Sequence, residues 1–146
     1  MKQESYELFK NADIYKITEV IDAELKTRNE QAFWGEKVVP FTEAILSVLI
    51  PLRESNSLFT PEGVKVDELT PELFFKWSDF VSLKSLAFTI QRSNKLEDES
   101  KTDIDLKILG DYLGHYNVNL EDEQLDFPIS HYNLHQGVSN VIKSLL

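Results

Sequence analysis

The feature that most constrains the fold is a long segment whose apolar side chains recur at three- and four-residue steps. Between Asn29 and Glu54, further apolar residues widen the main stripe almost around the helical cylinder. A helix that is apolar on most sides lies at the centre of a domain, where neighbouring helices cover it. Two prolines inside the segment, Pro40 and Pro51, each remove a backbone donor. We therefore predict a long central helix that is kinked near both prolines.

Amphipathic segments on both sides of this helix supply its neighbours. Each predicted start combines a capping residue or a proline with apolar residues at helical steps. No alternating strand pattern and no internal repeat accompany them. We predict an all-α fold, a compact bundle of five to six helices in a single domain over 13–146, and a flexible N-terminal segment over 1–12. The predicted starts are Asp13, Thr70, Ser82, Asp103 and the residues after Pro128.

Large aromatic side chains at helical spacing are expected to form the core of this bundle, because burying them contributes most to its stability. On the two helices that begin at Thr70 and Asp103, bulky residues recur at the steps that define one helical face. The side chains expected to face inward there are Phe74, Trp77, Phe80, Val81, Ile104, Ile108 and Tyr112.

Acidic residues are concentrated in one stretch of the chain. The formal charge is −10, and residues 97–126 hold ten acids against two lysines. Such a run is ordinarily a solvated surface. The alternative is a docking surface for a basic partner, because concentrated charge steers association. The candidate partner-binding residues are Glu97, Asp98, Glu99, Glu121, Asp122, Glu123 and Asp126.

The residue types required for most catalytic chemistries are missing or badly spaced. The chain has no cysteine, which excludes a thiolate nucleophile and a Cys-ligated metal. None of its five glycines opens a phosphate-binding loop. His131 and His135 have a metal-ligand spacing, but the pattern indicates no third ligand. We interpret them as ordinary histidines at the surface or the edge of the core, and we predict no catalytic, cofactor-binding or metal-binding residue.

The order of several helical signatures points to a known family. Phe33-Trp34 opens the long helix, which closes with Leu52-Arg53. Leu109-Gly110-Asp111-Tyr112-Leu113 comes next, then an acidic loop and the run from His131 to Val138. This order resembles the all-α domain of type IV secretion coupling proteins, the TraD/TraG- and DotL-like ATPases of conjugation and effector export. The resemblance spans roughly Asp13 to Leu146, nearly the whole chain.

This resemblance implies a function in substrate recognition. In coupling proteins the domain recruits a relaxase, a relaxosome component or an effector to a membrane-anchored homohexameric motor. The phosphate-binding and metal-binding motifs of that ATPase have no counterpart in this chain, so the chain alone is not expected to be an enzyme or to need a cofactor. Its acidic character favours a basic cargo or accessory protein over direct contact with DNA.

A second interpretation belongs to a different class of protein. A free-standing acidic helical inhibitor, or an immunity-type protein that masks a basic partner, would carry the same excess of acids. The longest apolar stretch, Ala44 to Leu52, falls far short of the roughly 20 residues that a bilayer requires. Under either interpretation we expect a cytoplasmic domain without membrane contact.

Overall fold

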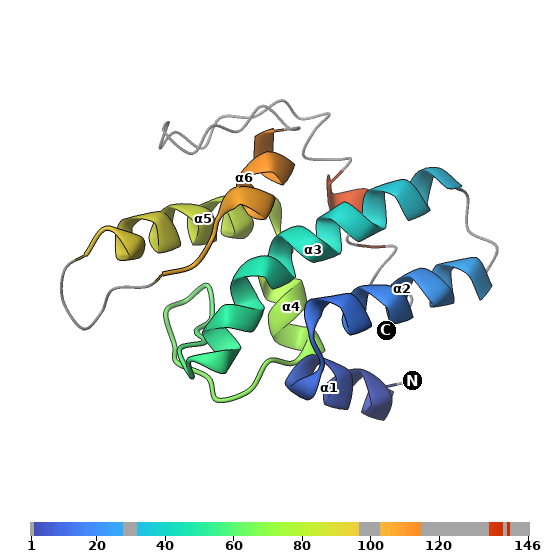
Figure 1. The fold of residues 1–146 in the computed structure, drawn as a ribbon, viewed down its shortest axis with the longest axis horizontal. Helices are drawn as coiled ribbons and strands as arrows, with labels where there is room; N and C mark the ends of the chain where they lie inside the picture. Colours follow the sequence, from blue (N-terminus) through green and yellow to red (C-terminus); the bar gives the residue numbers. More distant parts are fainter. Residues whose placement is uncertain (1, 28–31, 97–102, 115–134, 139, 141–146) are drawn as a thin grey trace.

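The computed structural model describes residues 2–27, 32–96, 103–114, 135–138 and 140, and they are mostly helical (Figure 1). Within these residues no strand forms, and the one β-like contact is an isolated antiparallel bridge between Phe59 and Lys65. The prediction of an all-α bundle is therefore confirmed. Residues 135–138 are also helical, and the named helices are α1 (Lys2–Asn11), α2 (Ile14–Thr27), α3 (Ala32–Glu54), α4 (Pro71–Trp77), α5 (Phe80–Asn94) and α6 (Lys107–Gly114).

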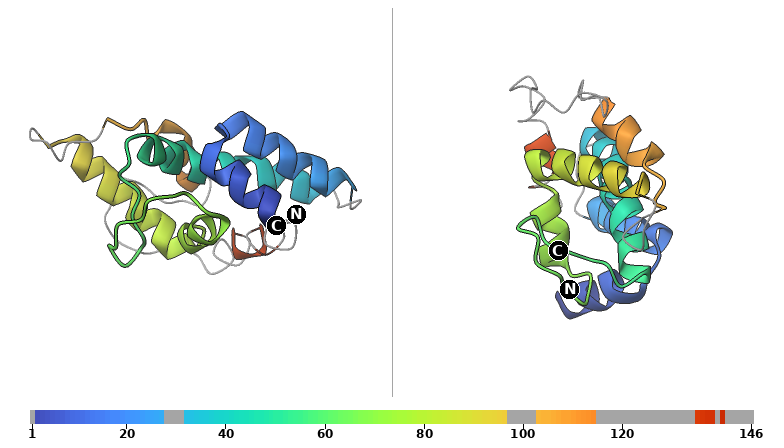
Figure 2. Two further views of the ribbon diagram at one scale, coloured as in Figure 1. Left: turned by 90° about the horizontal axis from the view of Figure 1, so that it is seen from below. Right: turned by 90° about the vertical axis from the view of Figure 1, so that its left-hand side faces the viewer.

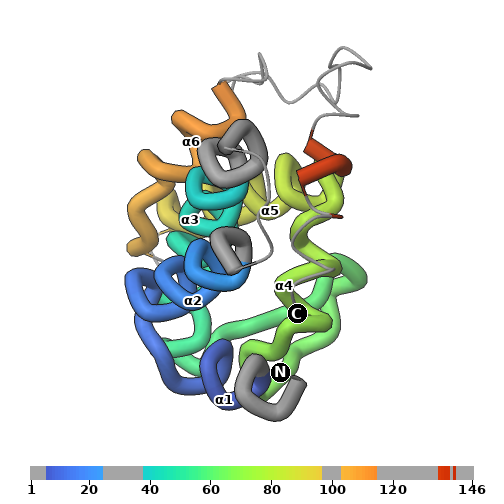
Figure 3. Tube along the Cα trace, turned by 90° about the vertical axis from the view of Figure 1, so that its right-hand side faces the viewer, coloured from blue at the N-terminus to red at the C-terminus, as the bar shows by residue number. Residues whose placement is uncertain are grey.

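Helix α3 is the central element, as its apolar surface predicts. It contacts α2, α4 and α6, and Figure 3 shows it between α2 and α6. It continues as one helix through Pro40 and Pro51, although each proline removes a helical hydrogen bond. Its buried side chains, on several sides of the cylinder, are Val38, Phe41, Ala44, Ile45, Leu46, Val48, Leu49 and Leu52.

The other helices also contact one another. Helix α1 contacts both α2 and α4, while α5 contacts α4 and α6. Figure 2 shows α1 and α2 at one end of the molecule and the carboxyl end of α5 at the other. A single apolar core results, to which the described helices and the loop before α4 contribute.

The starts of α4 and α5 are set by side-chain caps. Thr70 accepts a hydrogen bond from the Leu73 amide at 3.1 Å, and Pro71 takes the first helical position, as predicted. The prediction that Ser82 caps the next helix is wrong. Asp79 is the N-cap, because its carboxylate accepts from the Ser82 amide at 3.1 Å and so starts α5 at Phe80.

Helix α6 begins at Lys107, four residues later than Asp103, the predicted start. The backbone of Ile104 is bonded to the Asn94 side chain, so it does not enter a helix there. The buried residues of α6 are Leu109, Tyr112 and Leu113. Two residues predicted to face inward are exposed, Ile108 of α6 at 46% and Val81 of α5 at 37%.

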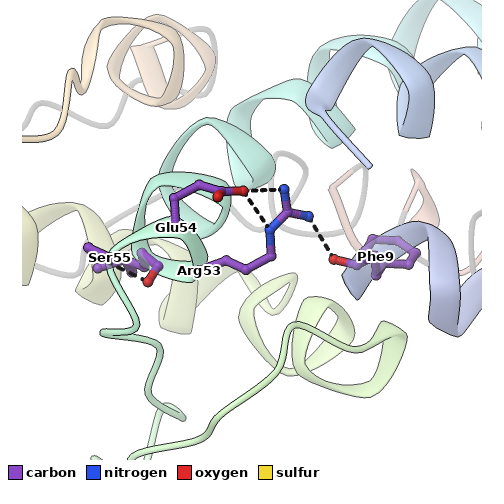
Figure 4. A network of polar contacts seen from close by, with 5 residues as sticks. Phe9, Arg53, Glu54 and Ser55 are labelled. Atoms are coloured by element: carbon purple, nitrogen blue, oxygen red, sulfur yellow. Dashed lines mark hydrogen bonds and ion pairs between the residues drawn. The ribbon is translucent and has the colours of Figure 1, made fainter. Parts of the chain in front are cut away.

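The N-terminal residues belong to the domain, which corrects the predicted boundary at Asp13. Residues 2–11 form α1, and Phe9 is fully buried with its ring centroid 5.3 Å from that of Phe74. The last carbonyls of a helix have no partner within it. The Arg53 guanidinium satisfies one of them, because Nη1 donates to the Phe9 carbonyl at 2.9 Å (Figure 4). Phe9 and this bond anchor α1 to the end of α3.

Glu54 holds the Arg53 side chain in place for this contact. Its Oε1 accepts from Arg53 Nε at 3.1 Å and from Nη2 at 2.6 Å (Figure 4). Two exposed side chains of α1 form further contacts. Lys10 pairs with Glu68 at 3.3 Å, and the Tyr6 hydroxyl donates to Glu72. In the structure, Arg53 of the Leu52-Arg53 pair near the end of α3 therefore connects that helix to α1.

Candidate functional site

The seven predicted partner-binding acids, Glu97 to Glu99, Glu121 to Glu123 and Asp126, lie outside the described residues. The described part of the acidic stretch, 103–114, carries three exposed acids, Asp103, Asp105 and Asp111. Asp111 forms an exposed ion pair with Lys107 at 3.6 Å. The structure does describe the residues that precede and follow the acidic segments. It shows the hydrogen bonds that connect them.

One side chain connects the described residues that flank the first acidic segment. At the end of α5, Asn94 Nδ2 donates to the Ile104 carbonyl at 2.8 Å, and the Ile104 amide donates to Asn94 Oδ1 at 3.1 Å. The side-chain amide of Asn94 thus forms the same two hydrogen bonds with Ile104 that a peptide group of a neighbouring β-strand would form. We call this pair of residues the Asn94 clamp. It holds together the two ends of the stretch that contains Glu97, Asp98 and Glu99.

A buried histidine connects the described residues that flank the second acidic segment. His135 Nδ1 lies 2.6 Å from the Tyr112 hydroxyl of α6, and Nε2 lies 2.5 Å from the carbonyl oxygen of Ser78. A carbonyl only accepts, so Nε2 carries the proton and Nδ1 accepts from the phenol. We call these three residues the His135 clamp. Glu121, Asp122, Glu123 and Asp126 lie between Tyr112 and His135 in the sequence.

Burial and aromatic rings surround the imidazole of the His135 clamp. His135 is fully buried, and the rings of Phe41 and Phe80 have centroids 4.9 Å from its own. Burial lowers the pKa of His135 from 6.5 to about 4, against the opposing effects of its bond to the Ser78 carbonyl and the charge of Asp79. The ring is therefore neutral at pH 7.

This environment corrects the interpretation of His135 as a surface or core-edge residue. Both ring nitrogens are engaged by protein groups, so neither has a lone pair free for a metal ion. No group of three or more potential ligands that could hold a metal occurs among the described residues. His131, the second histidine of the predicted pair, lies outside them.

The two clamps lie at opposite ends of α5. Ser78 and Asp79 precede its first residue, whereas Asn94 is its last. A 15-residue helix spans about 22 Å. Residues 104 to 112 therefore lead from one clamp to the other along α5, and Figure 1 shows α6 beside that helix. The described residues that flank the two acidic segments, with Asn94 and Ile104 in one clamp and Tyr112 and His135 in the other, thus lie near the two ends of α5.

A buried lysine lies on α5 between the clamps. Lys84 is 2% exposed, and its ammonium lies 5.7 Å from the centroid of the Phe88 ring. None of the described acids forms an ion pair with it, and its described cation–π contact is with the Phe88 ring. Sequence reasoning missed Lys84, although its spacing of four residues from both Phe80 and Phe88 places it on the buried face of α5.

The comparisons of the chain with known proteins do not assign it to a family. Among the described helices, none combines the length and apolar character needed to cross a lipid bilayer. Comparisons with known protein families, with curated proteins and with solved structures find no match in any of the three.

Proposed function

We propose that this chain is the substrate-recognition domain of a type IV secretion coupling protein and that it binds a basic protein. The observation that supports this proposal best is the pair of clamps. Each acidic segment lies between residues that described hydrogen bonds hold together. Fixing the ends of a segment lowers the conformational entropy that it loses on binding. Clamped segments rich in carboxylates are therefore suited to contact a partner.

The positions of the clamps also support a proposal about the shape of the partner. Their separation along α5, about 22 Å, suits a partner with two basic patches or one extended basic segment. The concentrated charge of the acidic segments also steers a basic protein toward the domain. A relaxase, a relaxosome accessory protein or a secreted effector with such basic surfaces is the proposed cargo.

The cellular context of the proposal follows from the resemblance. We place the domain on the cytoplasmic side of an inner-membrane-anchored homohexamer whose remaining domains hydrolyse ATP. A reading frame that extends beyond this chain and encodes a Gly-x-x-x-x-Gly-Lys-Thr/Ser loop would support this context. A complete gene limited to this chain would favour the alternative, a free-standing inhibitor or immunity-type protein.

Neutralising one acidic segment tests the proposal directly. The triple variant Glu121→Gln, Asp122→Asn, Glu123→Gln keeps side-chain size and removes three charges. Calorimetric titration with the relaxase or accessory protein encoded beside this chain should show affinity reduced about tenfold, since each exposed pair contributes up to about 1 kcal/mol.

A matched control removes the same charge from another part of the surface. Glu7, Glu19 and Asp67 are exposed and lie on α1, on α2 and in the loop before α4. The triple variant Glu7→Gln, Glu19→Gln, Asp67→Asn should bind as the unchanged chain does. Equal losses in both variants would mean that total charge, rather than the clamped segment, governs binding. Unchanged affinity in both would remove the acidic segment from the proposal.

A further inference from the structure

The His135 clamp connects parts of the chain that are distant in sequence. His135 lies 57 positions from Ser78 and 23 from Tyr112, and its ring touches Phe41 of α3 as well. Val138, one turn later, is fully buried in the same core. Figures 1 and 3 show the turn of residues 135–138 in red, beside α3 and the start of α5. Docking of this turn therefore depends on the bonds and packing of His135 and Val138.

Docking of the turn also carries a cost. The side-chain carbonyl oxygen of Gln136 is buried and has no hydrogen-bond partner among the described residues. A buried polar atom without a partner opposes the state that buries it. This unpaired oxygen therefore offsets part of the stabilisation that His135 and Val138 give to the docked turn.

Burial disfavours the protonated form of His135 in the docked state, because the imidazole is fully buried between aromatic rings. A second proton would make Nδ1 a donor, so the Tyr112 hydroxyl would have to turn its own proton away and accept from the ring. The groups around the ring offer little compensation. They are the Phe41 ring from α3, the Phe80 ring and the Asp79 carboxylate from α5, and the Tyr112 phenol from α6.

We propose that residues 135–138 form a proton-released latch, which is docked on α3, α5 and α6 while His135 is neutral and undocks when the imidazole is protonated. Undocking separates Tyr112 from His135 and so releases one end of the chain between them. The Asn94 clamp contains an amide and a peptide group, neither of which titrates in this range, so it stays closed. Any effect of the latch on partner binding rests on the proposed function, whereas the latch itself does not.

The direction of the pH effect follows from the two protonation states. The pKa of His135 is about 4 when docked and returns toward 6.5 when the ring is exposed. Below pH 6.5 the undocked form therefore binds more protons, and acid favours it. The ratio of docked to undocked molecules should fall about tenfold per pH unit until the pH reaches the docked value. Above pH 6.5 the ratio should not change.

Hydrogen exchange measured by NMR on the whole chain tests the latch without any partner. The opening constant of the His135 Nε2 proton and of the amides of 136–138, corrected for intrinsic exchange, should rise about 30-fold between about pH 7.5 and about pH 5. The Ile104 amide, held by the Asn94 clamp, and the amides of α3 should keep their opening constants. An opening constant of the turn that does not change with pH, or one that rises together with those of α3, would overturn the latch.

The variant His135→Gln provides the matched control. Glutamine retains one donor and one acceptor for Ser78 and Tyr112 but does not titrate. In this variant, the opening constant of the amides of 136–138 should not change over the same pH range. A rise equal to that of the unchanged chain would assign the effect to another group. If this variant does not fold, a direct titration of His135 in the unchanged chain decides, since a docked ring that titrates near 6.5 contradicts the proposal.

Discussion

Asn94 shows how one side chain at the residue scale can position a much longer segment. Its amide group forms two hydrogen bonds with the backbone of Ile104, whose side chain is 9% exposed. The variant Asn94→Ala removes both bonds and leaves the peptide groups of Ile104 without these partners. We expect the free energy of unfolding, measured with urea, to fall by about 1–3 kcal/mol.

A control on the same helix separates this loss from a general effect of substitution in α5. Thr89 is exposed on α5, so Thr89→Ala should change the stability by less than about 0.5 kcal/mol. Exchange of the Ile104 amide should accelerate in Asn94→Ala and remain unchanged in Thr89→Ala. An Asn94→Ala variant that keeps full stability and a protected Ile104 amide would show that the clamp is unnecessary.

The polar residues of the clamps were the hardest part of the structure to predict from sequence. The spacing of His131 and His135 suggested a surface pair or a metal site, and both interpretations presupposed accessible rings. The position of His135 depends on the Ser78 carbonyl and the Tyr112 hydroxyl, which reach it from 57 and 23 positions away. A sequence pattern records neighbours a few residues apart, so it carries no signal for such a contact.

At the scale of elements, periodicity predicted most helices because burying an apolar stripe is what stabilises a helix in a small domain. The starts of α2 and α4 were correct because Asp13 and Thr70 act through local hydrogen bonds. The start of α6 was wrong because Asn94, ten positions from Ile104, engages its backbone. Helix α1 was missed because its contribution to the core is concentrated in one side chain, Phe9.

This role of Phe9 makes α1 open to a simple test. The side chain is fully buried between α1 and Phe74, so Phe9→Ala leaves a cavity at the junction of α1 with the bundle. We expect the free energy of unfolding to fall by about 3–5 kcal/mol. Urea denaturation followed by circular dichroism measures the change.

The neighbouring Tyr6 supplies the control for α1. It is 41% exposed, and its hydroxyl donates to Glu72. Tyr6→Phe removes one exposed hydrogen bond and should change the stability by less than about 0.5 kcal/mol. If both variants changed the free energy of unfolding by similarly small amounts, residues 1–12 would not be part of the folded domain.

At the scale of the whole molecule, the distribution of charge decides between two classes of partner. The chain has a formal charge of −10, and residues 97–126 contribute −8 of it. Neutralisation of DNA phosphates requires clustered Lys and Arg, and each neutralised phosphate makes binding more sensitive to salt. A basic protein instead gains affinity from the same acids, over a range of about 8 Å at physiological salt.

The two classes therefore give opposite results in one titration. At about 0.15 M salt, the isolated chain should show no measurable binding to duplex DNA of random sequence in a fluorescence anisotropy assay. Its affinity for the basic partner should fall as salt is raised, because the carboxylates that attract the partner are screened. Tight DNA binding that weakens steeply with salt would contradict a protein partner, since it would mean that the exposed lysines and arginines outweigh the acids at the contact surface.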